Sequence, residues 1–269
     1  MINNERRARE LAEEFRNQHA LGDQPIKDMF ELVHVAAGVD VISMPAAEAE
    51  HGLSMTDPTT GRTVIAVATT HHPMRQRSSI AHELGHILGR DLERPKPLTP
   101  GERSPEEIRA DAFARHLLLP LGGVRRHCSR AQGEISLVDL SDLIQEFEVS
   151  PSMAAIQLRD LKLIDQDTCA AWNGHSTTQL AARFGWLSQY RSLAADSAQP
   201  RAPQGLMARA VQGYRRGVLS ITELASWYGQ DAADLEEHLG PQLQRDVQLD
   251  DDWDSDAPLF PDADASPAT

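Results

Sequence analysis

The chain has 269 residues, a formal net charge of −14 and a hydrophobic content of 41%. This acidity argues against direct binding to DNA, because proteins hold phosphates with an excess of Lys and Arg. No stretch approaches the roughly 20 apolar residues of a membrane span, and the N-terminus lacks the apolar run of a signal peptide. The two cysteines, Cys128 and Cys169, are too far apart in sequence to indicate a disulfide framework or a Cys-type zinc site. We therefore expect a cytoplasmic protein.

The first part of the chain predicts two helices followed by a small sheet. Apolar residues at helical spacing predict a helix from Asn3 to His19, and Pro25–Asp28 is typical of the start of a second helix, which Gly38 ends. Runs rich in β-branched residues predict strands at 39–42 and 63–69. Residues 52–55, ahead of the turn residues at 57–61, are a further candidate strand. We expect these strands to form a small antiparallel sheet.

The central motif is His82-Glu83-x-x-His86. Residues four apart lie on one face of a helix, so His82 and His86 can offer two imidazole nitrogens to a single ion. Zinc is the natural candidate, because it accepts His nitrogens in a tetrahedral site. Glu83 lies about 100° further round the helix, where it can reach a water at the metal without being a ligand.

The helix that carries this motif is predicted by apolar residues at 80, 84, 87 and 88. Ser78 or Ser79 fits its N-cap, and Gly89 fits its C-terminal end. Gly85, inside the helix, would allow another backbone to pack closely against it.

A catalytic zinc site needs a third protein ligand. The metzincin pattern HExxHxxGxxH is excluded, because Leu92 stands where its third His would be. The next helix, opened by Ser104 and Pro105, contains Glu107 and Asp111 in an ExxxD arrangement. In glutamate-type zincins such a Glu ligates the metal and the Asp one turn later orients a ligand His. Like charges at this spacing destabilise an ordinary helix, a conflict that a nearby dication would remove.

Other assignments remain open at this point. Glu107 could instead close a capping box with Ser104, and Glu106 is the alternative ligand if the helix register differs by one residue. Four further histidines are possible but weaker candidates for the third ligand: His71, His72, His116 and His127.

From Ser136 onward the chain predicts mainly helices. A helix over 137–147 is followed, after a short break at 149–151, by another helix, and such a pair resembles a helix-turn-helix unit. The tail carries eight Asp and no Lys or Arg after position 245, so we expect it to be disordered. The resulting boundaries are 131–170 for the helix-turn-helix-like module, 171–203 for an ambiguous segment that ends in linker-like composition, 204–245 for a C-terminal helical region and 246–269 for the acidic tail.

Two segments carry a resemblance to a known family. Residues 76–86 resemble the active-site segment of the ImmA/IrrE metallo-endopeptidases, and residues 107–120, with Glu107, Asp111 and Phe113, are similar to the second motif of that family. The similarity extends over about residues 20–165. One departure is Ser78-Ser79, where the family usually has Phe-Thr; it changes capping or packing and leaves the chemistry intact.

The resemblance implies an α+β fold, with a zincin-like peptidase domain over residues 1–130 ahead of the helical module. It implies that His82, His86 and Glu107 bind one zinc ion, that Asp111 orients a ligand, and that Glu83 is catalytic. Manganese or iron could replace zinc. The substrate class that it implies is a helix-turn-helix repressor of the Xre type, cut to relieve repression in bacterial stress or mobile-element control.

Two other functions compete with this interpretation. The chain could be a metal-bound module that binds a regulator without cutting it, although the intact Glu83 favours a peptidase. It could also be a DNA-binding regulator acting through residues 136–163, which the many acidic residues disfavour. The donor that stabilises the oxyanion is unassigned, with a His or Tyr of the C-terminal half as the candidate type. We expect the strand at 63–69 to border the cleft and to pair with an extended substrate.

Overall fold

The computed structural model describes residues 2–46, 52–91, 104–131 and 133–240. The chain divides into two compact units, Met1–Arg209 and Ala210–Thr269. The described residues form a small three-stranded sheet and 13 helices, which confirms the predicted α+β class. The predicted acidic tail, 246–269, lies outside the described residues.

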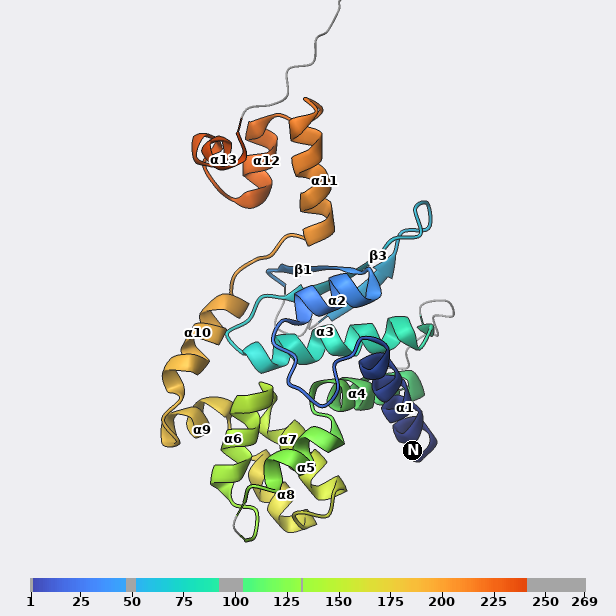
Figure 1. Ribbon diagram of the computed structural model, residues 1–269, viewed down its shortest axis with the longest axis vertical. Coiled ribbons are helices and arrows are strands. Elements are labelled where there is room, and N and C mark those ends of the chain that lie inside the picture. The colour runs from blue at the N-terminus through green and yellow to red at the C-terminus, as the bar shows by residue number, and fades with distance from the viewer. Residues whose placement is uncertain (1, 47–51, 92–103, 132, 241–269) are drawn as a thin grey trace, which may run out of the picture. The chain divides into compact units, whose positions relative to one another are not determined.

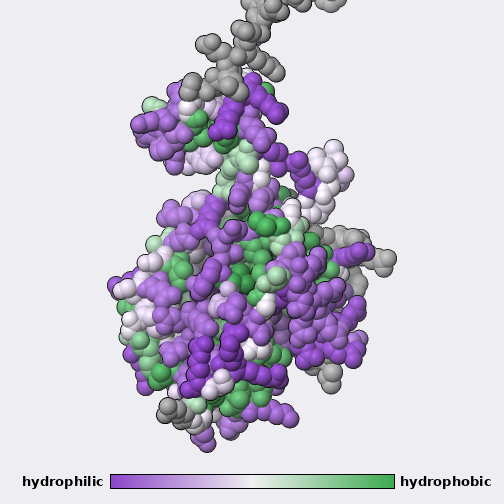
Figure 2. Space-filling view, viewed as in Figure 1, coloured by the Kyte–Doolittle hydropathy of each residue, from purple (hydrophilic) through white to green (hydrophobic). Residues whose placement is uncertain are grey.

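Two helices begin the first unit, as the sequence predicts. Helix α1 spans Ile2–Gln18 and α2 spans Met29–Ala37. Asp28 caps α2, because its carboxylate accepts the backbone N–H groups of Phe30 and Glu31. Gly38 ends α2 with a φ of 65°, a left-handed conformation that glycine adopts without strain. In Figure 2, where the visible face of this unit is mainly hydrophilic, hydrophobic residues gather over α2.

The sheet is mixed, whereas we expected it to be antiparallel. Its strands are β1 (Asp40–Met44), β2 (Gly52–Thr56) and β3 (Thr63–Ala68), in the order β1-β3-β2. Strands β2 and β3 form an antiparallel hairpin, while β1 pairs with β3 in parallel. The chain reverses between β1 and β2 and again at the hairpin, so β3 regains the direction of β1. The residue pattern predicts each strand but does not reveal which neighbour β1 takes.

Helix α3 spans Pro73–Leu88 and begins earlier than predicted. His72 is its N-cap, and Pro73 occupies the first turn, where proline fits a helix; Ser78 and Ser79 therefore lie inside the helix and cap nothing. The sequence does not predict the first turns of α3, because buried polar residues interrupt the apolar stripe there. The buried Arg77 is one of them, and its guanidinium donates to the backbone carbonyls of residues 26, 27 and 148. Gly89 is the C-cap, as predicted.

Helix α4, Pro105–Leu118, packs directly on α3. The close approach depends on Gly85, because a Cβ there would lie 2.9 Å from the Cδ1 atom of Phe113 and 3.3 Å from the Cα of Ala110. Figure 1 shows α3 between the sheet and α4, with α1 against α4. The parts of α3 and α4 that carry His82, His86 and Glu107 thus lie close together.

Helices fill the rest of the first unit. Ser136, Ser150 and Ser176 each accept a backbone N–H from the first turn of the helix that they precede. Residues 171–203, ambiguous in sequence, are largely helical, because Trp186 and Tyr190 are buried and anchor α10. The helices are α5 (Leu121–Cys128), α6 (Leu137–Phe147), α7 (Pro151–Asp160), α8 (Gln166–Asn173), α9 (Thr177–Arg183) and α10 (Leu187–Ser197).

The second unit is entirely helical over its described residues. Helix α11 spans Gln204–Arg215, and the second unit begins within it, at Ala210. Helices α12 (Ile221–Tyr228) and α13 (Ala232–Leu239) follow. Ser220 opens α12 with the predicted capping box, and Asp231 caps α13. None of the described helices in either unit is long and apolar enough to cross a membrane.

Candidate metal centre

Three side chains from α3 and α4 converge on one point. His82 and His86 lie one turn apart on α3, and their Nε2 atoms are 3.0 Å apart. The carboxylate of Glu107, from the first turn of α4, places Oε2 3.2 Å from Nε2 of His82 and Oε1 3.3 Å from Nε2 of His86. Within the described residues, these three form a group that could hold a metal ion.

The distances between the candidate ligand atoms fit tetrahedral coordination of an ion. Ligand atoms about 2.0–2.1 Å from a zinc ion in a tetrahedral arrangement lie about 3.3 Å from one another. The three contacts of 3.0, 3.2 and 3.3 Å are close to that edge length. The fit agrees with zinc chemistry, in which two His and one Glu are an established catalytic ligand set.

The outer nitrogens of both histidines have carboxylate partners. Nδ1 of His82 lies 2.8 Å from Oδ1 of Asp111, and Nδ1 of His86 lies 2.9 Å from Oδ2 of Asp91. Ionised carboxylates only accept hydrogen bonds, so each Nδ1 is the donor. In the neutral rings both Nε2 atoms then present lone pairs, and the Glu107 carboxylate adds a negative charge. Acceptors that converge in this way repel one another unless a cation lies among them.

Asp91 is a member of the site that our sequence analysis missed. It follows α3, and its other oxygen, Oδ1, pairs with the guanidinium of Arg109 on α4. Gly89 makes room for this pair, because a Cβ there would lie 2.9 Å from Nη2 of Arg109 and 3.2 Å from Oδ2 of Asp91. A carboxylate five residues after His86 was visible in the sequence, but only the packing of α4 on α3 shows that it reaches the ring.

Glu83 lies in the same cavity as the ligand group. The cavity has a volume of about 450 Å³, and its lining includes His82, Glu83 and Glu107. Glu83 is 8% exposed, and Gly52 of β2 packs on its side chain: a Cβ at Gly52 would lie 3.1 Å from Oε1 of Glu83. The bordering strand is therefore β2. We expected β3, but β3 is the central strand and is paired on both sides.

The structure brings Glu107, and not Glu106, into the histidine group. The backbone N–H of Glu107 donates to Oγ of Ser104 at 3.2 Å, so Ser104 caps α4 as predicted. The Glu107 side chain does not turn back to complete a capping box but reaches both histidines. One residue thus joins the helix cap through its backbone and the candidate site through its carboxylate.

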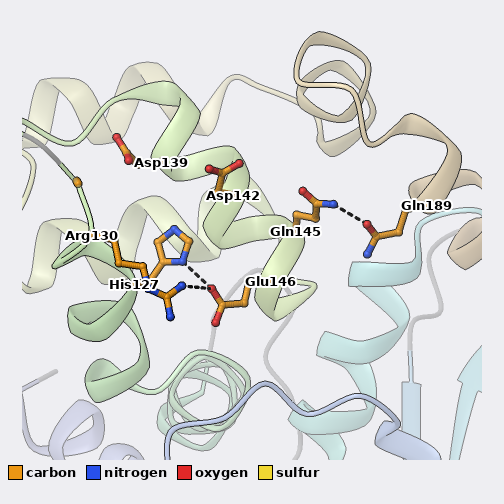
Figure 3. A pocket seen from close by; sticks show the side chains of 8 residues that line it. His127, Arg130, Asp139, Asp142, Gln145, Glu146 and Gln189 are labelled. Atoms are coloured by element: carbon orange, nitrogen blue, oxygen red, sulfur yellow. Dashed lines mark hydrogen bonds and ion pairs between the residues drawn. The ribbon is translucent and has the colours of Figure 1, made fainter.

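The other candidate histidines lie outside this group. His116 is buried with its Nε2 2.7 Å from Glu5, and His72 is the N-cap residue of α3. The carbonyl of His71 accepts a hydrogen bond from Tyr190. Figure 3 shows the ring of His127 directed at Glu146 of α6. The distance from Nδ1 of His127 to Oε2 of Glu146 is 2.7 Å.

Comparison with known proteins agrees with this geometry. Residues 35–159 match the family model described as the IrrE N-terminal-like domain, Peptidase_M78. The match covers α3 and α4 and therefore all three residues of the ligand group. It confirms the resemblance inferred from the two sequence motifs. A search of curated proteins found no match.

Proposed function

Residues 35–159 match the M78 peptidase family model, and from this match we propose that the protein is a zinc-dependent endopeptidase that cuts an Xre-type helix-turn-helix repressor. One observation carries the enzymatic part of the proposal: His82, His86 and Glu107 converge on one point, and Glu83 lines the same cavity without joining them. Three protein ligands leave a fourth tetrahedral position open, as catalytic zinc sites require.

The chain supplies the proton chemistry through Glu83. Zinc bound by the three ligands would lower the pKa of a water molecule and polarise the scissile carbonyl. Glu83 accepts the proton of the attacking water and passes it to the leaving amine. Gly52 packs against its side chain and limits its movement, which suits a base that has to be held at a fixed distance from the water.

Strand β2 offers a place for the substrate backbone. It pairs with β3 along one side and is an edge strand within the described sheet. An extended peptide could add to such an edge by main-chain hydrogen bonds, beside Glu83. The choice of an Xre-type repressor rests on the family resemblance.

Metal analysis combined with a cleavage assay tests the proposal. Elemental analysis should find about one zinc per chain, and manganese or iron would revise the identity of the ion. An Xre-type helix-turn-helix repressor, supplied as the substrate, should be cut by the metal-loaded chain and spared after chelation. His82→Ala and His86→Ala should lose the ion, and its full retention in both variants would refute the site. Stable binding of the repressor without any cleavage would favour the non-cleaving module.

A further inference from the structure

A second cavity lies beside the metal cavity along α3. It also has a volume of about 450 Å³, and the two cavities share Arg75 and Ser78. The N-terminal ends of α7 and α9, together with α10, contribute to the wall of the second cavity. Its lining residues are His72, Met74, Arg75, Ser78, Ser150, Ser176, Thr177, Thr178 and Tyr190.

The lining of this cavity is rich in hydrogen-bond donors. Hydroxyl groups are its commonest polar groups, and Arg75 adds a permanent positive charge. Ser150 and Ser176 already accept a backbone N–H as helix caps, so each still has its O–H to donate. No Asp or Glu is among the described residues that line the cavity, although the chain contains 40 of them. The cavity therefore suits a ligand that is negatively charged and accepts hydrogen bonds.

The distance of this cavity from the candidate metal group shows which substrate side chain it could hold. Arg75 precedes His82 by two turns of α3, a rise of about 10 Å. An extended peptide advances about 3.3 Å per residue. A substrate that lies along α3 would therefore place in this cavity a side chain about three residues from the scissile bond.

We propose that this second cavity is a specificity subsite for an Asp or Glu side chain of the peptide substrate, about three residues from the cleaved bond. The inference rests on the proposed peptidase function. Arg75 and the hydroxyl groups bind the carboxylate, and the Gln or Asn counterpart loses the charge-assisted hydrogen bonds, which corresponds to about a tenfold or larger drop in kcat/KM.

The test is a cleavage profile of the metal-loaded full chain on a complex peptide mixture, read by mass spectrometry. Acidic residues should be enriched at one position, two to four residues from the cut. A pair of synthetic peptides that differ only by Glu or Gln at that position then measures the preference. Arg75→Glu should change the preference at that position from acidic residues to Lys. Thr178→Val should weaken the preference for Glu over Gln. Metal content is measured in each variant, and the Glu-to-Gln ratio is read within one variant, so a general loss of activity does not affect it.

Arg183→Gln is the matched control, because Arg183 is an exposed cation of α9 that lines neither cavity. It should leave the preference unchanged. Cleavage without an acidic preference, or a preference that Arg75→Glu does not alter, would overturn the subsite and leave the peptidase standing. If the metal-loaded chain cuts neither the peptides nor the repressor, the proposed function fails and the subsite fails with it.

Discussion

Two histidine–carboxylate clusters in the first unit contain similar groups but balance their charges differently. Between α1 and α4, the carboxylate of Glu5 accepts two hydrogen bonds from Arg115, at 2.7 and 2.8 Å, and one from His116 at 2.7 Å. The hydrogen bond from His116 and the charge of Arg115 lower the pKa of Glu5 to about 2, against the opposing effect of burial. The chain itself supplies the cation of this cluster.

In the group of His82, His86 and Glu107, no Lys or Arg of the described residues pairs with the Glu107 carboxylate. The two histidines have committed their Nδ1–H groups to Asp91 and Asp111, and the nearest partners of Glu107 are the two facing Nε2 atoms. A histidine beside a carboxylate is therefore not sufficient to indicate a metal site. A metal site is better indicated by several hydrogen-bond acceptors that converge on one point without a donor between them.

The largest expected loss of cleavage without loss of the ion is at a residue of the metal cavity that is outside the candidate ligand set. Glu83→Gln should keep the ion, because Glu83 is not a ligand, and should lower repressor cleavage by at least about 10²–10⁴-fold through the loss of the general base. Elemental analysis and single-turnover cleavage measure the two effects. A Glu83→Gln variant as active as the wild type would remove Glu83 from the mechanism.

The same substitution in each cluster gives the sharpest comparison. Glu107→Gln should weaken metal affinity strongly and abolish cleavage while the fold survives, because a charged ligand is lost. Glu5→Gln and Glu106→Gln should leave metal affinity unchanged. Competition with a chromogenic chelator measures all three variants. A loss of metal affinity in Glu106→Gln would show that the assigned helix register is wrong by one residue. Unchanged metal affinity in Glu107→Gln would show that the third ligand is another residue.

The outer carboxylates should give intermediate effects. Asp91→Asn and Asp111→Asn each remove a partner that orients a ligand ring, and such losses typically weaken metal binding or activity by about 10–100-fold. We expect the larger loss for Asp91, whose side chain is 14% exposed and pairs with Arg109, than for Asp111, whose side chain is 47% exposed. The absorption spectrum of the cobalt-substituted protein would report altered ligand geometry directly. Equal, negligible effects would contradict the assigned roles.

The smallest expected effect on cleavage belongs to the cluster of Glu5, Arg115 and His116, which should instead stabilise the fold near neutral pH. The pKa of Glu5 is lowered on folding, so its ion pair stabilises the fold above its ordinary pKa of 4.5. This contribution is lost as the pH falls toward about 2. Glu5→Gln should therefore lower Tm near neutral pH, and the difference from wild type should shrink below pH 4.5. Measuring both proteins without metal separates this cluster from the ligand group; a difference independent of pH would contradict it.

Local patterns in the sequence were enough to predict most elements and the grouping of His82, His86 and Glu107 as candidate ligands. The spacing of His82 and His86 and the capped helix that bears Glu107 are short-range features, and the structure brings their atoms together. Features that depend on packing between distant segments could not be predicted in the same way. The parallel pairing of β1 with β3 and the proximity of β2 to Glu83 join segments that are distant in sequence, and Asp91, which contacts His86, pairs with Arg109 of α4.

The buried guanidinium of Arg77 anchors the helix that carries His82 and His86. It sits five residues before His82 and ties the ligand-bearing helix to the carbonyls of Ile26, Lys27 and Glu148. These anchors hold the helix through contacts that involve no ion, unlike in zinc fingers, where metal binding supplies the folding energy. The protein should thus be preorganised, so that chelation and metal return switch the chemistry off and on while the chain stays folded.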